Sequence, residues 1–146
     1  MRKPGEIAPD FPVAGTTLHA MLAERGVVVF FFPKAFTPGC SREARGFARD
    51  HETFRQAGYG IVGVSADPQE VSDRFRQSLE LPYPLVGDPR GEILRAYKVR
   101  WPVIGLAQRV TYVVGRDRRI ASAFHSEFDA EAHVGRTCAV ARGGPQ

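Results

Sequence analysis

The sequence predicts an α/β fold in which a central mixed sheet is flanked by helices. Continuous β-branched and aromatic runs alternate with amphipathic segments along the chain, and a short polar turn joins the last two apolar runs. A length of 146 residues, with 43% apolar and 25% charged residues, is typical of a globular domain. We therefore expect residues 1–146 to form one domain.

The first predicted strand, Val27–Phe32, is an uninterrupted β-branched and aromatic run. Such a run is typical of a strand that is buried on both faces, as in a parallel sheet. The polar turn Gly115–Arg118 predicts a hairpin between the last two strands. The remaining predicted strands are Ile61–Ser65, Pro84–Gly87, Val110–Val114 and Ile120–Phe124.

Amphipathic segments between these strands predict helices. In the segment Cys40–Ala57, Phe47, His51 and Phe54 fall on one helical face. Further helices are predicted over Pro68–Glu80, Gly91–Tyr97 and Asp129–Arg142.

Composition excludes several classes of protein. Two cysteines cannot form a framework of several disulfides, and without a C-x2-C spacing they predict no zinc site. The longest apolar run, Gly26–Pro33, is far shorter than the roughly 20 residues that cross a bilayer. The basic start of the chain leads into no apolar signal segment. We therefore expect a cytoplasmic protein with no membrane partner, no metal and no cofactor.

The net charge of +4 does not indicate a nucleic-acid partner. Basic residues from Lys34 onward alternate with acids and apolar positions instead of forming a block, and small charge excesses usually concern solubility. We therefore expect no nucleic-acid binding.

One cysteine stands where chemistry is expected. Thr37 is a good N-cap residue, Pro38 suits the first helical position, and Cys40 then lies in the first turn. Free N–H groups and the positive end of the helix dipole favour a thiolate there. Outside this context Cys40 would be interpreted as a small buried apolar residue.

A helix terminus alone cannot ionise a thiol at neutral pH. An ordinary cysteine is about 3% thiolate at pH 7, and reaching about 90% takes roughly 3.4 kcal/mol of differential stabilisation. A helix terminus contributes up to ~2 kcal/mol in a partly buried site. We therefore expect a guanidinium close to the sulfur as well.

The segment from Pro33 to Cys40, with its P-x-x-x-T-x-x-C spacing, resembles the signature of peroxiredoxins. The flanking Phe31-Phe32 and Glu43-Ala44 make it most similar to the bacterioferritin comigratory protein subgroup. Arg109, before Thr111-Tyr112-Val113-Val114, matches the arginine of that family. Further matching pieces are Ala8-Pro9-Asp10-Phe11, Gly63-Val64-Ser65-Ala66-Asp67 and Gly87-Asp88-Pro89.

The resemblance implies a thioredoxin-like fold and a thiol peroxidase that reduces hydrogen peroxide and organic hydroperoxides. It makes Cys40 the peroxidatic cysteine, which becomes a sulfenic acid. Thr37 would hydrogen-bond the thiolate and the peroxide, and Pro33 would shield the sulfur from water. Arg109 would stabilise the thiolate and the leaving oxygen. Glu43 would orient Arg109 through a bidentate pair, although an acid early in a helix is also favoured by the dipole alone.

The resolving step is left open by the sequence. Members of the subgroup carry a second cysteine five positions after the first or in the following helix, but this chain has Arg45 at the first place and no cysteine within Pro68–Glu80. Cys138 is the only other cysteine. We expect a one-Cys enzyme that uses an external thiol such as thioredoxin, glutaredoxin or glutathione. Resolution by Cys138, within one chain or between two, is the alternative.

Two other functions compete with a peroxidase. A thioredoxin-type disulfide oxidoreductase needs C-x-x-C, and here Glu43 occupies the partner position of Cys40. A redox sensor or holdase on the same fold is compatible with the sequence. The chain lacks the C-terminal arm that builds rings in other subgroups, which indicates a monomer or a simple homodimer. The segment Trp101–Ile104 either lines an apolar substrate mouth or plugs the core.

Overall fold

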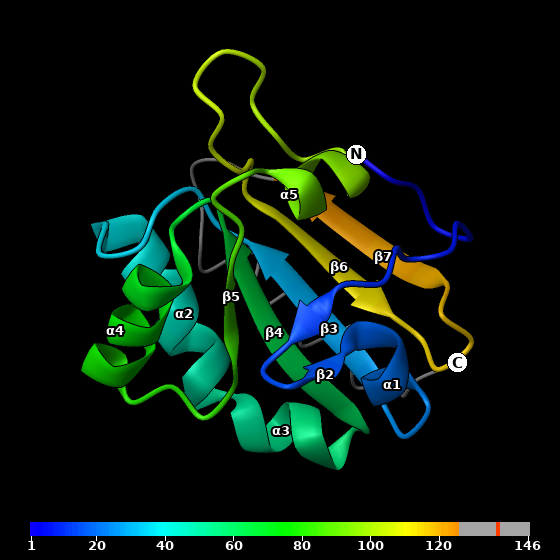
Figure 1. Cartoon of the computed structure of the whole chain (residues 1–146). Helices are drawn as coiled ribbons and strands as arrows, with labels where there is room; N and C mark the ends of the chain where they lie inside the picture. The colour runs from blue at the N-terminus through cyan, green and yellow to red at the C-terminus, as the bar shows by residue number, and fades with distance from the viewer. Residues whose placement is uncertain (126–136, 138–146) are drawn as a thin grey trace.

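The computed structural model describes residues 1–125 and Thr137, and its centre is a five-stranded mixed sheet (Figure 1). The strand order is β5-β4-β3-β6-β7, with β3 parallel to β4 and antiparallel to β6. The strands are β3 (Gly26–Phe31), β4 (Tyr59–Ser65), β5 (Leu85–Gly87), β6 (Val110–Val114) and β7 (Ile120–His125). Each agrees with its predicted strand to within two residues.

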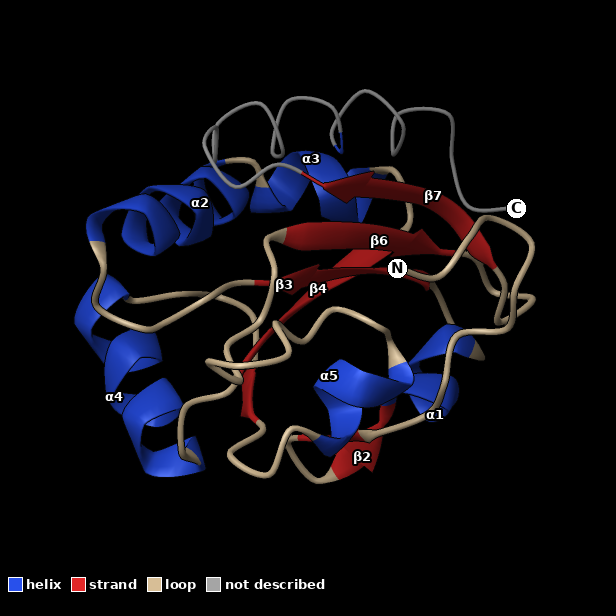
Figure 2. Cartoon of the chain, turned by 90° about the horizontal axis from the view of Figure 1, so that it is seen from above, coloured by secondary structure: helices blue, strands red, loops and turns tan. Residues whose placement is uncertain are grey.

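Helices cover both faces of this sheet (Figure 2). One face is covered by α2 (Pro38–Arg49), α3 (His51–Gln56) and α4 (Gln69–Leu79). The other is covered by α1 (Leu18–Leu22), α5 (Glu92–Ala96) and a small hairpin of β1 (Pro12–Val13) and β2 (Thr16–Thr17). None of the helices in the described part of the chain is long and apolar enough to span a bilayer.

The central strand β3 explains why its sequence is apolar throughout. Val27, Val29 and Phe31 pack into the core beneath α1 and α5. Val28 and Phe30 pack on the opposite face, against α2 and its neighbours. All are fully buried, because a strand with helices on both sides has no solvent face to which polar residues could be assigned.

The helical predictions that fall within residues 1–125 are confirmed with one correction. The predicted helix Cys40–Ala57 is two helices, since the backbone at Asp50 (φ −96°, ψ 9°) leaves helical geometry between α2 and α3. The α1 helix and the β1–β2 hairpin were not predicted. The helix expected over Asp129–Arg142 lies outside the described residues.

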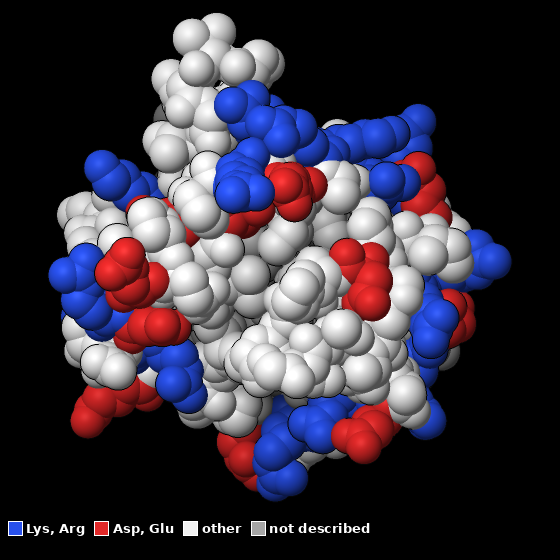
Figure 3. Space-filling view, viewed as in Figure 1, with Lys and Arg blue, Asp and Glu red and all other residues white. Residues whose placement is uncertain are grey.

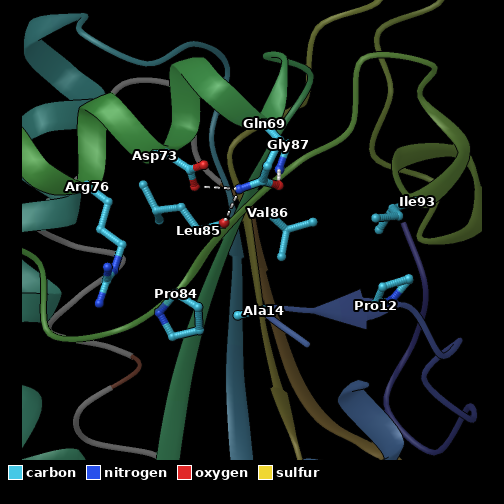
Figure 4. A pocket seen from close by; sticks show the side chains of 10 residues that line it. All are labelled: Pro12, Ala14, Gln69, Asp73, Arg76, Pro84, Leu85, Val86, Gly87 and Ile93. Atoms are coloured by element: carbon cyan, nitrogen blue, oxygen red, sulfur yellow. Dashed lines mark hydrogen bonds between the residues drawn. The ribbon is translucent and has the colours of Figure 1, made fainter. Parts of the chain in front are cut away.

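The outer edge of β5 is covered by a side chain. The amide of Gln69, at the start of α4, donates to the carbonyl of Leu85 (3.0 Å) and accepts from the N–H of Gly87 (2.7 Å) (Figure 4). The same amide nitrogen donates to Asp73 Oδ1 at 2.9 Å, which fixes its orientation. Two of the backbone groups of β5 that face away from β4 are therefore hydrogen-bonded.

Candidate active site

Cys40 lies where the sequence predicts it, as the third residue of α2. Pro38 is the first helical residue, and the N–H of Ser41 donates to the carbonyl of Thr37 (2.9 Å) to close the first turn. The thiol is free, and only 1% of Cys40 is exposed. The sulfur therefore lies at the positive end of the helix, largely screened from bulk water.

Arg109 brings a guanidinium to this sulfur. It directly precedes β6, whose first residue, Val110, pairs with Phe31 at the end of β3. This antiparallel register places Arg109 beside the segment that connects β3 to α2. Its Nη2 donates to Sγ of Cys40 at 3.5 Å, and only 6% of the arginine is exposed. The guanidinium expected beside the sulfur is thus supplied from 69 positions away.

Glu43 completes the cluster from one turn further along α2. Because it follows Cys40 by three residues, both side chains lie on the same helical face. Its Oε1 accepts from Nη1 of Arg109 at 2.8 Å, and the glutamate is fully buried. The expected bidentate pair is not the arrangement observed. The guanidinium divides its donors, with one directed to the carboxylate and one to the sulfur.

The charges around Arg109 counteract the effect of burial on its pKa. Burial on its own would lower the pKa of the guanidinium, but the charges of Glu43 and Cys40 outweigh it and raise that pKa above the ordinary value. Arg109 is therefore a permanent cation beside the thiol.

Thr37 differs from its expected role in one respect. Its hydroxyl donates to the carbonyl of Lys34 at 2.8 Å. It gives α2 no side-chain cap, although its backbone does have the extended conformation of an N-cap residue. The observed bond closes the loop that precedes α2, so in this structure the hydroxyl is engaged away from the sulfur. Pro33 lies half-buried in the same loop.

Asp67 holds this loop and was not predicted to belong to the site. It follows β4, whose end lies beside the end of β3 because the two strands are parallel. Its Oδ2 accepts from the N–H of Ala35 (2.8 Å) and from the hydroxyl of Ser65 (2.7 Å). The loop between Pro33 and Thr37 is thereby anchored to the neighbouring strand.

Gly39 is a second residue that the sequence did not single out. A Cβ at this position would lie 3.3 Å from Nη2 of Arg109, closer than most real contacts. A glycine directly before the cysteine therefore lets the guanidinium approach the first turn of α2. The glycine itself was visible in the sequence, but no local pattern showed that the side chain of Arg109 approaches it.

Phe36 packs the loop against α4. Its ring meets that of Phe75 edge to face, with centroids 5.1 Å apart. The backbone of Phe36 is in the left-handed region (φ +66°), which few non-glycine residues adopt. This contact ties the segment before Cys40 to the helix layer.

A groove of about 680 Å³ lies elsewhere, between α4, β5 and the β1–β2 hairpin (Figure 4). Leu85 and Val86 form its floor, and Gln69, Asp73 and Arg76 form its polar wall. None of the residues lining it is a predicted site residue. This groove therefore does not coincide with the predicted site at the first turn of α2.

Of the two positions that concern a second, resolving thiol, Arg45 and Cys138, only one lies within the described residues. Arg45, at the position where the subgroup carries a resolving cysteine, is exposed on α2. Cys138 lies outside the described residues. The one-Cys route therefore stays the prediction, with resolution by Cys138 as its alternative.

Residues 4–123 match the model of the AhpC/TSA family. The fold is similar to the crystal structure of peroxidoxin BcpB from Mycobacterium tuberculosis, with a TM-score of 0.90, 32% identity and 98% of both chains covered. It is also similar to peroxiredoxin Q of Xanthomonas campestris, with a TM-score of 0.82 and 27% identity over 92% of this chain and 90% of that one. The chloroplastic peroxiredoxin Q of Oryza sativa subsp. japonica is 30% identical over 91% of this chain and 64% of its own length.

Proposed function

Because the chain belongs to the AhpC/TSA family and is a peroxiredoxin, that is, a thiol peroxidase, we propose that Cys40 is its peroxidatic residue and that it works as a one-Cys enzyme with an external thiol. The observation that carries this proposal is the 3.5 Å contact between Nη2 of Arg109 and Sγ of Cys40. A guanidinium at that distance lies where it can stabilise negative charge that moves between the sulfur and a bound peroxide.

The proposed reaction moves two electrons from sulfur to peroxide. The thiolate of Cys40 attacks one peroxide oxygen, so that an S–O bond forms while the O–O bond breaks. The departing oxygen takes up a proton and leaves as water or an alcohol, and the cysteine becomes a sulfenic acid. An external thiol then forms a mixed disulfide with loss of water, and a second thiol releases Cys40.

Arg109 acts on the charge that moves in this step. Negative charge passes from the sulfur to the departing oxygen, and a fixed guanidinium beside both positions stabilises it throughout the transfer. Glu43 holds that guanidinium through its 2.8 Å bond and is a positioning residue. The loop before α2 supplies the two remaining proposed roles. Pro33 shields the sulfur, and Thr37 exchanges its bond to Lys34 for one to the incoming peroxide.

The one-Cys route is supported by what surrounds Cys40. Arg45 occupies the usual position of a resolving thiol, and the chain has no cysteine in α4. The peroxides proposed are hydrogen peroxide and organic hydroperoxides. One similar structure, from Xanthomonas campestris at 26% identity, concerns alkyl peroxide reduction by a bacterioferritin comigratory protein. The thiol donors proposed are thioredoxin, glutaredoxin or glutathione in the cytoplasm, for a monomer or simple dimer.

The test is turnover of hydrogen peroxide with dithiothreitol by the full chain, with Cys40→Ser as the inactive variant. A redox sensor would instead oxidise once and stop. Mass spectrometry of the peroxide-treated protein without reductant then identifies the route. We expect oxygen to be added at Cys40, and Cys138→Ser to keep most turnover. A peptide linking Cys40 to Cys138 would contradict the one-Cys proposal.

A further inference from the structure

A loop between α5 and β6 projects from the molecule close to the active site (Figure 1, top). We call residues 99–108 the finger. Its two arms are hydrogen-bonded, because Gln108 N–H donates to the carbonyl of Val99 (2.6 Å) and Trp101 N–H donates to that of Leu106 (2.9 Å). The finger is therefore a defined structure that holds its tip away from the core.

The tip of the finger carries two exposed aliphatic side chains. Val103 is 95% exposed and Ile104 is 65% exposed. The tip is closed by a bond of 3.0 Å from the N–H of Gly105 to the carbonyl of Trp101, with Gly105 in the left-handed region (φ +71°). Adjacent aliphatic side chains held largely in water lose hydrophobic stabilisation, so they indicate a surface that something else covers.

Positive charge gathers at the base of the finger, and Figure 3 shows the blue side chains beneath the white projection. The segment from residue 90 to the tip contains four cations and one acid: Arg90, Arg95, Lys98, Arg100 and Glu92. Within the described residues no ion pair involves any of the four cations. The base therefore presents a net positive surface, with Glu6 the acid whose charge interacts with Lys98.

Arg100 differs from the other three cations. Its Nε lies 3.2 Å from where a Cβ of Gly91 would be, and its Nη2 lies 3.0 Å from the same point at Gly105. Arg100 is thus packed into the neck of the finger and helps to shape it. Arg95 and Lys98 are exposed and free to contact a partner.

We propose that the finger attaches this protein to anionic membrane surfaces. Val103 and Ile104 enter the boundary between headgroups and acyl chains, while Arg95 and Lys98 contact lipid phosphates. A convex aliphatic tip suits a bilayer, which deforms around it, whereas a protein partner would need a matching cavity. Two inserted side chains form no long apolar run, which is why hydropathy led us to expect no membrane partner.

The attachment would bring the membrane close to the reacting thiol. Ala107, on the returning arm of the finger, bridges to Arg100 and lies two residues before Arg109. The proposal depends on the exposed surface of the finger alone. It does not depend on the peroxidase activity proposed above.

The test uses the full chain and vesicles of phosphatidylcholine and phosphatidylglycerol in equal parts, with pure phosphatidylcholine vesicles for comparison. We expect co-sedimentation with the anionic vesicles and release by salt. Trp101 is the only tryptophan of the chain and stands at the neck of the finger, so its fluorescence should shift to shorter wavelength on binding. No binding to the anionic vesicles would overturn the proposal.

The apolar variant is Val103→Ser with Ile104→Ser, which changes only exposed side chains. It should bind anionic vesicles at least about tenfold more weakly while keeping the circular dichroism spectrum of the wild type. The matched control is Ile7→Ser, because Ile7 is a 45% exposed aliphatic residue far from the finger in sequence. An equal loss in both variants would contradict insertion of the tip.

The charge variant is Arg95→Gln with Lys98→Gln, and its matched control is Arg45→Gln with Arg74→Gln on α2 and α4. Each cation near an anionic surface contributes to the free energy of binding. We therefore expect the Arg95 and Lys98 substitutions to weaken binding by about tenfold and the Arg45 and Arg74 substitutions to weaken it much less. If both pairs weaken binding equally, the attraction is to net charge and not to the finger. If wild type instead captures only an acidic protein and no vesicles, the finger is a protein-docking element.

Discussion

Replacing Arg109 by methionine removes the cation from the sulfur with a side chain of similar length. At 3.5 Å, the interaction between two unit charges is about 4.7 kcal/mol at an effective dielectric constant of ~20 and about 1.2 kcal/mol in water. These limits correspond to losses of roughly 3000-fold and eightfold. We expect the second-order rate constant for hydrogen peroxide to fall by about 10- to 1000-fold, since only part of the interaction is felt in the transition state.

The assay is competition with a haem peroxidase for limiting hydrogen peroxide, which reports oxidation of Cys40 independently of the reductant. Loss of the guanidinium removes the partner that donates to the buried Glu43 carboxylate at 2.8 Å, and breaking a buried pair in this way costs about 3–5 kcal/mol of stability. Arg109→Met is therefore paired with Glu43→Gln in a second variant that restores a neutral interior.

The matched control is Arg42→Met, an exposed arginine on α2 itself. It should react at nearly the wild-type rate. If the double variant of Arg109 and Glu43 stays folded and reacts within threefold of wild type, the guanidinium does not stabilise the reacting charge and our account of the site is wrong.

Three further outcomes are expected. Gly39→Ala forces Nη2 of Arg109 away from its 3.3 Å approach, and lengthening the contact to the sulfur by about half an ångström should slow the peroxide reaction about threefold in the same competition assay. Asp67→Ala leaves the buried N–H of Ala35 without its acceptor, so urea titration should show a loss of about 1–3 kcal/mol in the free energy of unfolding. Burial raises the pKa of Tyr112 from 10.0 to about 12, so its contribution to stability is complete below pH 10 and disappears as the pH rises to 12, a loss of up to ~2.7 kcal/mol. Tyr112→Phe should make the urea midpoint less sensitive to pH over that interval, whereas an unchanged dependence would exclude this phenol as its source.

Much of the fold could be predicted because its signals are local. The strand β3 is apolar at every position, and the turn before β7 is polar and short. The β1–β2 hairpin escaped prediction because each strand has two residues and its turn uses Ala14 in the left-handed region (φ +42°), which the sequence does not announce. The break at Asp50 escaped for a related reason, since aspartate within an amphipathic pattern does not mark a boundary.

In the candidate site, too, some residues follow from local sequence patterns and others do not. Cys40 follows from a local pattern of an N-cap residue and a proline at the start of a helix. Arg109 was found through its resemblance to a family motif, and its distance to the sulfur is visible only in three dimensions. Asp67 was missed because its partner, Ala35, is 32 positions away and no local spacing relates a carboxylate to a distant backbone N–H. Contacts of this kind depend on strand register, which single-sequence patterns do not fix.

The amide of Gln69 has a consequence for how copies of this molecule meet one another. An edge strand offers a row of unpaired backbone groups on which a second chain can grow, and this is how sheets merge into aggregates. At β5 one side chain already occupies two of the backbone groups, on Leu85 and Gly87, with which an incoming strand would pair. A single glutamine of α4 therefore hinders the growth of the sheet at this border.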